Sequence, residues 1–215
     1  MSQETACVRL RGKNTQSPAL IKPYGQVLME GNPIFEWNAV SGSNQYDVNI
    51  LSQDKHWKST TSSLKLAFSK EQNLEPGKTY QIIIQSYKGK ELQGVSVSAF
   101  SILNKSDQLQ LTNYISDIRK GTIESQAKSI VALYNHYELT DEAIRYLERL
   151  KKINKTNPSI YRLLGDSYLD AGFPDLAEVN YQIAYRIAWG SDSSSEAMLA
   201  NTGLQNIENI IGNPQ

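Results

Sequence analysis

The sequence predicts two folded parts of different class, an antiparallel β-sandwich followed by a solenoid of paired α-helices. Between Pro18 and Asn104, short apolar runs with a period of two alternate with turn residues at intervals of about ten. After Asp107 the period changes to 3.6, which is typical of amphipathic helices. A strand pattern cannot continue as a helix pattern without a new core, so we expect a multidomain β + α protein.

The expected domain boundaries follow from the same changes in the pattern of apolar and polar residues. Residues 1–17 are polar and have no period, which predicts a flexible tail. The sandwich is expected over residues 18–104. A short polar joint at 104–107 leads into a helical domain at 107–215, made of about two helix pairs with flanking helices.

Seven strands are expected in the sandwich, because alternating side chains separate into an inner and an outer face. Phe35 and Trp37 share one face, and Tyr80, Ile82 and Ile84 share another. Glycine, proline and serine punctuate the runs, as turns require. The expected strands are Ala19–Lys22, Ile34–Ala39, Gln45–Leu51, Lys55–Ser59, Ser63–Phe68, Thr79–Tyr87 and Val95–Leu103.

The sandwich resembles a fibronectin type III domain. The resemblance rests on an early Trp37, on Tyr46 in the next strand, and on the string LEPGKTY over residues 74–80. It implies that Trp37 lies in the core and that Tyr80 forms a tyrosine corner, whose hydroxyl satisfies a backbone group of the preceding loop. The immunoglobulin-type disulfide is absent, since Cys7 is the single cysteine.

The helical part is organised around residues 158–189. Four residues recur at i, i+3, i+4 and i+7, Gly172 ends that helix, and Pro174 begins a second one. Small residues allow the two helices to cross closely. The small and large residues on the facing sides of the two helices are Tyr161, Leu164, Gly165, Tyr168, Ala177, Tyr181 and Ala184. This order of small and large residues resembles the tetratricopeptide repeat. An ordinary antiparallel helical hairpin is the alternative.

Further helices are expected on both sides of this pair. A shift of 34 residues, the tetratricopeptide length, sets Tyr134 against Tyr168 and Ala143 against Ala177, so residues 122–153 form a degenerate earlier repeat. One helix is expected to end near Gly121. A final helix over 196–211 resembles the first helix of a third repeat and is expected to cap the solenoid.

Composition and motifs argue against several functions. The 22 basic and 22 acidic residues balance. The part to Ser106 has 12 basic and 8 acidic residues, a net charge of +4, and the part after it has 10 basic and 14 acidic residues, a net charge of −4. Because neither part is strongly basic, no nucleic-acid partner is expected. No apolar run approaches the ~20 residues of a membrane helix, so no membrane insertion is expected. The two histidines, His56 and His136, fall in different domains, and no catalytic motif occurs. We therefore predict no enzymatic activity, no cofactor and no metal.

The tetratricopeptide resemblance implies a concave groove lined by the first helix of each pair, which receives a protein or peptide. Carried over by position, the partner-binding residues are Lys128 and Asn135 in the earlier repeat and Arg162, Asp166 and Leu169 in the later one. The two cations are expected to bond carboxylates of the partner. Simple exposed polar positions, including a solvated acidic face at Asp166, are the alternative.

Two function classes remain open. The first is a non-enzymatic adaptor or scaffold that binds a polypeptide through the helical groove. The second is an exported or cell-surface module, similar to bacterial fusions of these two folds, whose sandwich binds a glycan or another polymer on exposed aromatics such as Trp57 and Tyr87. The sequence as it stands predicts a soluble cytoplasmic protein, or a periplasmic or extracellular one if a signal peptide has been removed.

Overall fold

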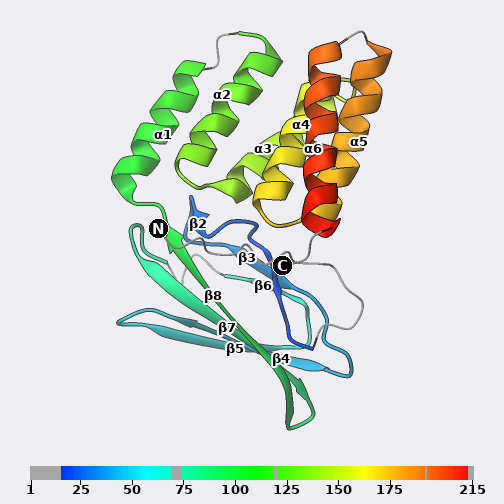
Figure 1. Cartoon of the computed structure of the whole chain (residues 1–215). Coiled ribbons are helices and arrows are strands. Elements are labelled where there is room, and N and C mark those ends of the chain that lie inside the picture. Colours follow the sequence, from blue (N-terminus) through cyan, green and yellow to red (C-terminus); the bar gives the residue numbers. More distant parts are fainter. Residues whose placement is uncertain (1–15, 69–73, 119–120, 192, 213–215) are drawn as a thin grey trace. The chain divides into compact units, whose positions relative to one another are not determined.

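The computed structural model describes residues 16–68, 74–118, 121–191 and 193–212. Strands come first along the chain and helices follow (Figure 1). The expected fold class, an antiparallel β region followed by helices, is thereby confirmed. The predicted tail, including Cys7, lies almost wholly outside the described residues. The chain divides into two compact units, one comprising the described residues to Tyr114 with Tyr137–Asp141, and the other the remaining described helical residues.

The β unit contains eight strands within the described residues. They are β1 (Leu20–Lys22), β2 (Val27–Leu28), β3 (Ile34–Trp37), β4 (Gln45–Leu51), β5 (His56–Thr61), β6 (Lys65–Ala67), β7 (Thr79–Lys88) and β8 (Glu91–Ile102). The sequence did not predict β2, which is only two residues long. It also placed the start of β8 at Val95, because the polar hairpin end at Glu91 lacks an apolar alternation.

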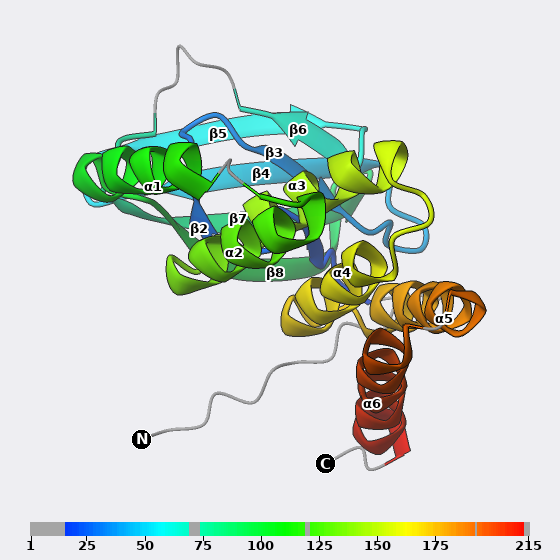
Figure 2. The ribbon, with the colours of Figure 1, turned by 90° about the horizontal axis from the view of Figure 1, so that it is seen from above.

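The strands form a three-stranded sheet, β1-β3-β6, and a five-stranded sheet, β2-β8-β7-β4-β5. All pairings are antiparallel except the short one between β2 and β8. In the long pairing of β7 with β8, Tyr80 lies opposite Phe100 and Ile82 opposite Ser98. Figure 2 shows β5, β4, β7 and β8 side by side in this order.

Side chains from both sheets build one apolar core. Phe35 and Trp37 of β3 are 0% and 2% exposed, and the inward residues of β4 and β7 are equally buried. The Phe35 and Phe100 rings are 5.3 Å apart between centroids, and the Trp37 and Tyr46 rings 5.7 Å. The predicted core position of Trp37 is therefore confirmed.

Both core tyrosines satisfy a backbone amide. The Tyr80 hydroxyl accepts a hydrogen bond from the Glu75 N–H at 2.7 Å, and the Tyr46 hydroxyl accepts one from the Val40 N–H at 3.1 Å. Each amide would otherwise be a buried donor without a partner, which is costly. The predicted role of Tyr80 as a tyrosine corner is confirmed.

Six helices follow within the described residues. They are α1 (Lys105–Ile118), α2 (Ile123–His136), α3 (Thr140–Ile153), α4 (Pro158–Asp170), α5 (Pro174–Gly190) and α6 (Ser194–Gly212). Helix α1 starts at the predicted joint, where the Asn104 side chain caps it by accepting from the Asp107 N–H at 2.9 Å. Helices α4, α5 and α6 lie against one another in both views (Figures 1 and 2).

Tyr181 of α5 explains the close packing of these three helices. A methyl group added at Gly165 of α4 would lie 2.6 Å from its ring, and one added at Gly203 of α6 would lie 2.5 Å from it. The ring is therefore held between two glycines, where no larger residue fits. The expectation that Gly165 permits a close helix crossing is confirmed.

The two turns between paired helices share one backbone feature. Gly172, between α4 and α5, has φ +77°, and Glu138, between α2 and α3, has φ +58°. These positions stand 34 residues apart (172 − 138), as the shift between the two repeats predicts. Glu138 is the only described residue other than glycine with positive φ. The earlier pair thus keeps the turn geometry of the later pair without its glycine.

Candidate functional site

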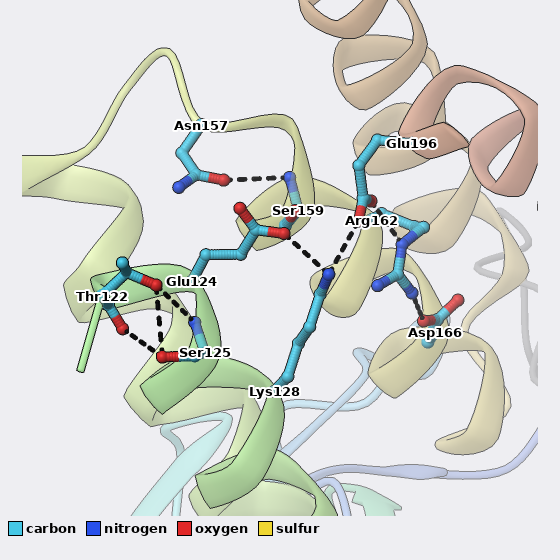
Figure 3. A network of polar contacts seen from close by, with 9 residues as sticks. All are labelled: Thr122, Glu124, Ser125, Lys128, Asn157, Ser159, Arg162, Asp166 and Glu196. Atoms are coloured by element: carbon cyan, nitrogen blue, oxygen red, sulfur yellow. Dashed lines mark hydrogen bonds and ion pairs between the residues drawn. The ribbon is translucent and has the colours of Figure 1, made fainter. Parts of the chain in front are cut away.

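Three charged residues from three helices meet in the helical unit. Lys128 extends from α2, Arg162 from α4 and Glu196 from the first turn of α6 (Figure 3). The Lys128 Nζ lies 3.1 Å from Glu196 Oε1, and the Arg162 Nε donates to Glu196 Oε2 at 2.6 Å. One carboxylate therefore bridges two cations, using one oxygen for each.

Further acidic groups complete this cluster. Glu124 pairs with Lys128 at 2.7 Å, one turn earlier on α2. Asp166 pairs with Arg162 at 2.5 Å, one turn later on α4, and accepts a hydrogen bond from the Tyr181 hydroxyl at 2.8 Å. We call Lys128, Arg162, Glu196, Glu124 and Asp166 together the charge cluster. It contains two positive and three negative side chains.

The first turns of α2 and α4 position the two cations. Thr122 caps α2 by accepting from the Ser125 N–H at 3.2 Å. Asn157 caps α4 by accepting from the Ser159 N–H at 3.0 Å, and Pro158 supplies a fixed φ at the first helical position. Lys128 and Arg162 then stand less than two turns inside their helices, where both side chains reach the start of α6 (Figure 3).

Exposure varies sharply across the charge cluster. The side chains of Lys128 and Glu124 are each 45% exposed, whereas Arg162 is 12% and Glu196 is 6% exposed. The cluster is therefore open to solvent at α2 and also at Asp166 of α4, whose side chain is 42% exposed, and it is closed at the Arg162–Glu196 contact. A buried ion pair of this kind is costly to break by removing one partner.

The environment shifts the pKa values of the cluster in different directions. Burial opposes ionisation of Glu196, but hydrogen bonds and charge from Arg162, with further bonds from Lys128 and Ser159, hold its pKa below the ordinary value. Burial raises the pKa of the Asp166 carboxyl despite its bonds to Tyr181 and Arg162. The Glu124 carboxylate raises the pKa of Lys128. Glu196 is thus held as the anion by its two cations.

Three of the five predicted binding residues lie in the charge cluster, namely Lys128, Arg162 and Asp166. Asn135 is exposed near the end of α2 and Leu169 is half-buried near the end of α4, both outside the cluster. Asp166 combines the two alternatives, because its side chain is 42% exposed while its two oxygens are bonded to Tyr181 and Arg162.

Sequence reasoning missed Glu196. Its signal was present, since Lys128, Arg162 and Glu196 recur at intervals of 34 residues. A carboxylate at the third place of a series that begins with two cations indicates an internal partner. The expectation that the last helix only caps the solenoid hid this relation, because no residue of that helix was assigned to the groove.

The aromatic residues proposed as a glycan platform are not fully exposed. Trp57 of β5 is half-buried, and its ring packs edge-on against Phe68 at 5.5 Å and lies 6.0 Å from Tyr80. Tyr87 at the end of β7 is also half-buried. Trp57 thus contributes to the sandwich core, which explains its sequence pattern without a ligand.

No group of three or more histidine, cysteine, aspartate or glutamate side chains in the part of the chain that the structure describes has an arrangement that could hold a metal ion. Among the helices that the structure describes, none is long and apolar enough to cross a membrane.

No protein-family model matches the chain, and no curated protein matches it either. Among solved structures, the chain is similar to the fn3 domain of the human collagen alpha-1(XX) chain. The match has 14% sequence identity and a TM-score of 0.34, and it covers 45% of this chain and 94% of that domain.

Proposed function

We propose that the protein is a non-enzymatic adaptor that binds another polypeptide through the face formed by α2 and α4. In this proposal the helix pairs α2–α3 and α4–α5 are tetratricopeptide-like repeats, and their first helices form the binding groove. The partner contacts Lys128 and Asn135 on α2 and Arg162, Asp166 and Leu169 on α4.

One observation carries the proposal. Lys128 and Arg162, at equivalent places on two successive first helices, converge on a single carboxylate at 3.1 and 2.6 Å. Two cations that share a carboxylate have the geometry with which proteins recognise acidic groups. The matching turns at Glu138 and Gly172 support the repeat relation between the two helix pairs.

Exposed positions on the same helix face allow a test that leaves the charge cluster intact. Ala132 and Asn135 follow Lys128 at i+4 and i+7, so all three share one face of α2, and all three are exposed. Lys152, exposed near the end of α3, provides a matched control position. A photo-crosslinking amino acid is introduced singly at each site in the full chain.

Crosslinking in the native lysate then maps the partner. We expect a discrete polypeptide adduct from positions 132 and 135 and none from position 152. The adduct should weaken in about 0.5 M salt, since partly exposed charges are screened. An adduct of equal yield from all three positions, or from position 152 alone, would refute binding at this face.

A further inference from the structure

We propose that Glu196 is an internal competitor, occupying the carboxylate site of Lys128 and Arg162 until a glutamate side chain of an acidic partner segment displaces it. This inference rests on the proposed function, because it assigns the partner's chemistry and a regulating residue to the same face. The α2–α4 face would then be closed by α6 in the free protein and opened by the partner.

The contacts of Glu196 define what the site accepts. Each oxygen serves one cation, with Lys128 Nζ at Oε1 and Arg162 Nε at Oε2, and the carboxylate is almost fully buried. The remaining Arg162 contact, from Nη1, goes to Asp166. A carboxylate from another chain would recover both cation contacts, so the site fits this group.

The charge count makes displacement necessary. The two cations already face three carboxylates, those of Glu196, Glu124 and Asp166. A fourth carboxylate added beside them would meet net repulsion from these three. Exchange with Glu196 instead keeps constant the number of carboxylates in direct contact with the two cations. An acidic ligand therefore competes with Glu196 and does not bind in addition to it.

Helix α6 can release Glu196 without leaving its place. The helix is anchored along its length, by Ala197, Ala200 and Ile207, which are 4%, 0% and 2% exposed, and by Gly203 against the Tyr181 ring. Ala197 follows Glu196 in the buried first turn, so release needs a change in the Glu196 side-chain conformation and no unwinding of the helix. The exposed side of the site, at Lys128, gives the incoming carboxylate its approach from solvent.

The test measures binding of a fluorescent oligoglutamate with an amidated C-terminus to the full chain by anisotropy. Glu196→Gln removes the internal carboxylate with little change in volume. We expect Glu196→Gln to lower the Kd for the oligoglutamate about tenfold or more, because no internal carboxylate then occupies the site at Lys128 and Arg162. Glu208→Gln, on the same helix with an exposed side chain, makes the same change in net charge and should leave affinity unchanged.

Two further arms identify the source of the effect. Adding Lys128→Gln to Glu196→Gln should abolish the gain in affinity for the oligoglutamate, since one of the two cations is lost. A neutral peptide with a free C-terminal carboxylate shares the chemistry of the ligand. Tight binding of that peptide with no binding of the amidated oligoglutamate would overturn the assignment to a glutamate side chain.

The remaining outcomes also decide the matter. Equal affinity in the wild type and Glu196→Gln would overturn the competition. If Glu196→Gln and Glu196→Ala both lose their helical circular dichroism, Glu196 is a structural anchor and the inference fails. If the inference fails in one of these two ways but crosslinking at position 132 persists, the adaptor proposal still stands. If Glu196→Gln binds the oligoglutamate tenfold more tightly but no crosslink forms, the carboxylate site is supported and the adaptor proposal is refuted.

Discussion

At the scale of single residues, polar tips on buried aromatic rings fix the positions of neighbouring segments. Tyr80 holds the Glu75 amide in the β unit, and Tyr181 reaches Asp166 in the helical unit. In both cases the ring fills a core while the hydroxyl makes a hydrogen bond to a polar group, the Glu75 amide in the first and the Asp166 carboxylate, which also pairs with Arg162, in the second.

Removal of the Tyr80 hydroxyl should therefore weaken the β unit. Tyr80→Phe leaves the Glu75 N–H without its acceptor, and we expect a loss of about 1–2 kcal/mol in the free energy of unfolding, measured by chemical denaturation. Tyr87→Phe, at a half-buried position of the same strand, should change it by less than about 0.5 kcal/mol. Equal effects of the two substitutions would show that Tyr80 is not a corner.

The two glycines around Tyr181 give a second residue-scale prediction. Gly203→Ala places a methyl group 2.5 Å from the ring, so we expect a loss of about 1–3 kcal/mol by overpacking. Gly190→Ala is the matched control, because a methyl group there meets nothing within 4 Å. It should be neutral or slightly stabilising in thermal unfolding. A neutral Gly203→Ala would mean that α6 does not pack on this ring.

At the scale of elements, the sequence predicted most strands and helices because their periodicity reflects burial directly. The pair α4–α5 was the clearest, since Gly172 and Pro174 mark its turn. The pair α2–α3 was harder to recognise because Glu138 occupies the turn position where glycine is expected. A left-handed backbone at a glutamate has no signal in the sequence other than the 34-residue shift.

This turn gives a prediction of stabilisation. Glu138→Gly removes the steric cost of φ +58°, so we expect the free energy of unfolding to rise by about 0.5–1 kcal/mol. Gly172→Ala imposes the same cost on the equivalent turn and should lower it by a similar amount. Chemical denaturation of both variants measures these two changes in the free energy of unfolding. A destabilised Glu138→Gly would show that the glutamate side chain supports the turn by other contacts.

The candidate site was only partly predictable, for a physical reason. Lys128 and Arg162 were found because repeat spacing places them on equivalent helix faces. The partner that neutralises them, Glu196, depends on where α6 packs, and that depends on Gly203 meeting Tyr181. Contacts between three helices are not encoded in the period of any one of them.

At the scale of the whole molecule, each half of the chain has its own core. The β unit is built around Trp37 and Phe35, and the helical unit contains the separate cluster of Tyr161, Ala184 and Ala200. Separate cores predict that residues 18–118, which hold the β unit up to Tyr114 together with the whole of α1, and residues 119–215 fold as independent fragments.

Circular dichroism of the two fragments checks this prediction. We expect a β spectrum from the first fragment, a helical spectrum from the second, and a cooperative thermal transition from each. A second fragment that is helical but melts without cooperativity would contradict independence, and would show that the helices need the β unit to complete their packing.

The most direct test of the central claim, that Lys128 and Arg162 form one carboxylate-binding site, is the side-chain Nε–H resonance of Arg162 in ¹H–¹⁵N spectra. In the wild type we expect a signal shifted by its hydrogen bond to Glu196 and protected from exchange with water. Glu196→Gln should weaken both properties, and saturating amidated oligoglutamate should restore them. A resonance that the oligoglutamate leaves unchanged in Glu196→Gln would contradict the claim.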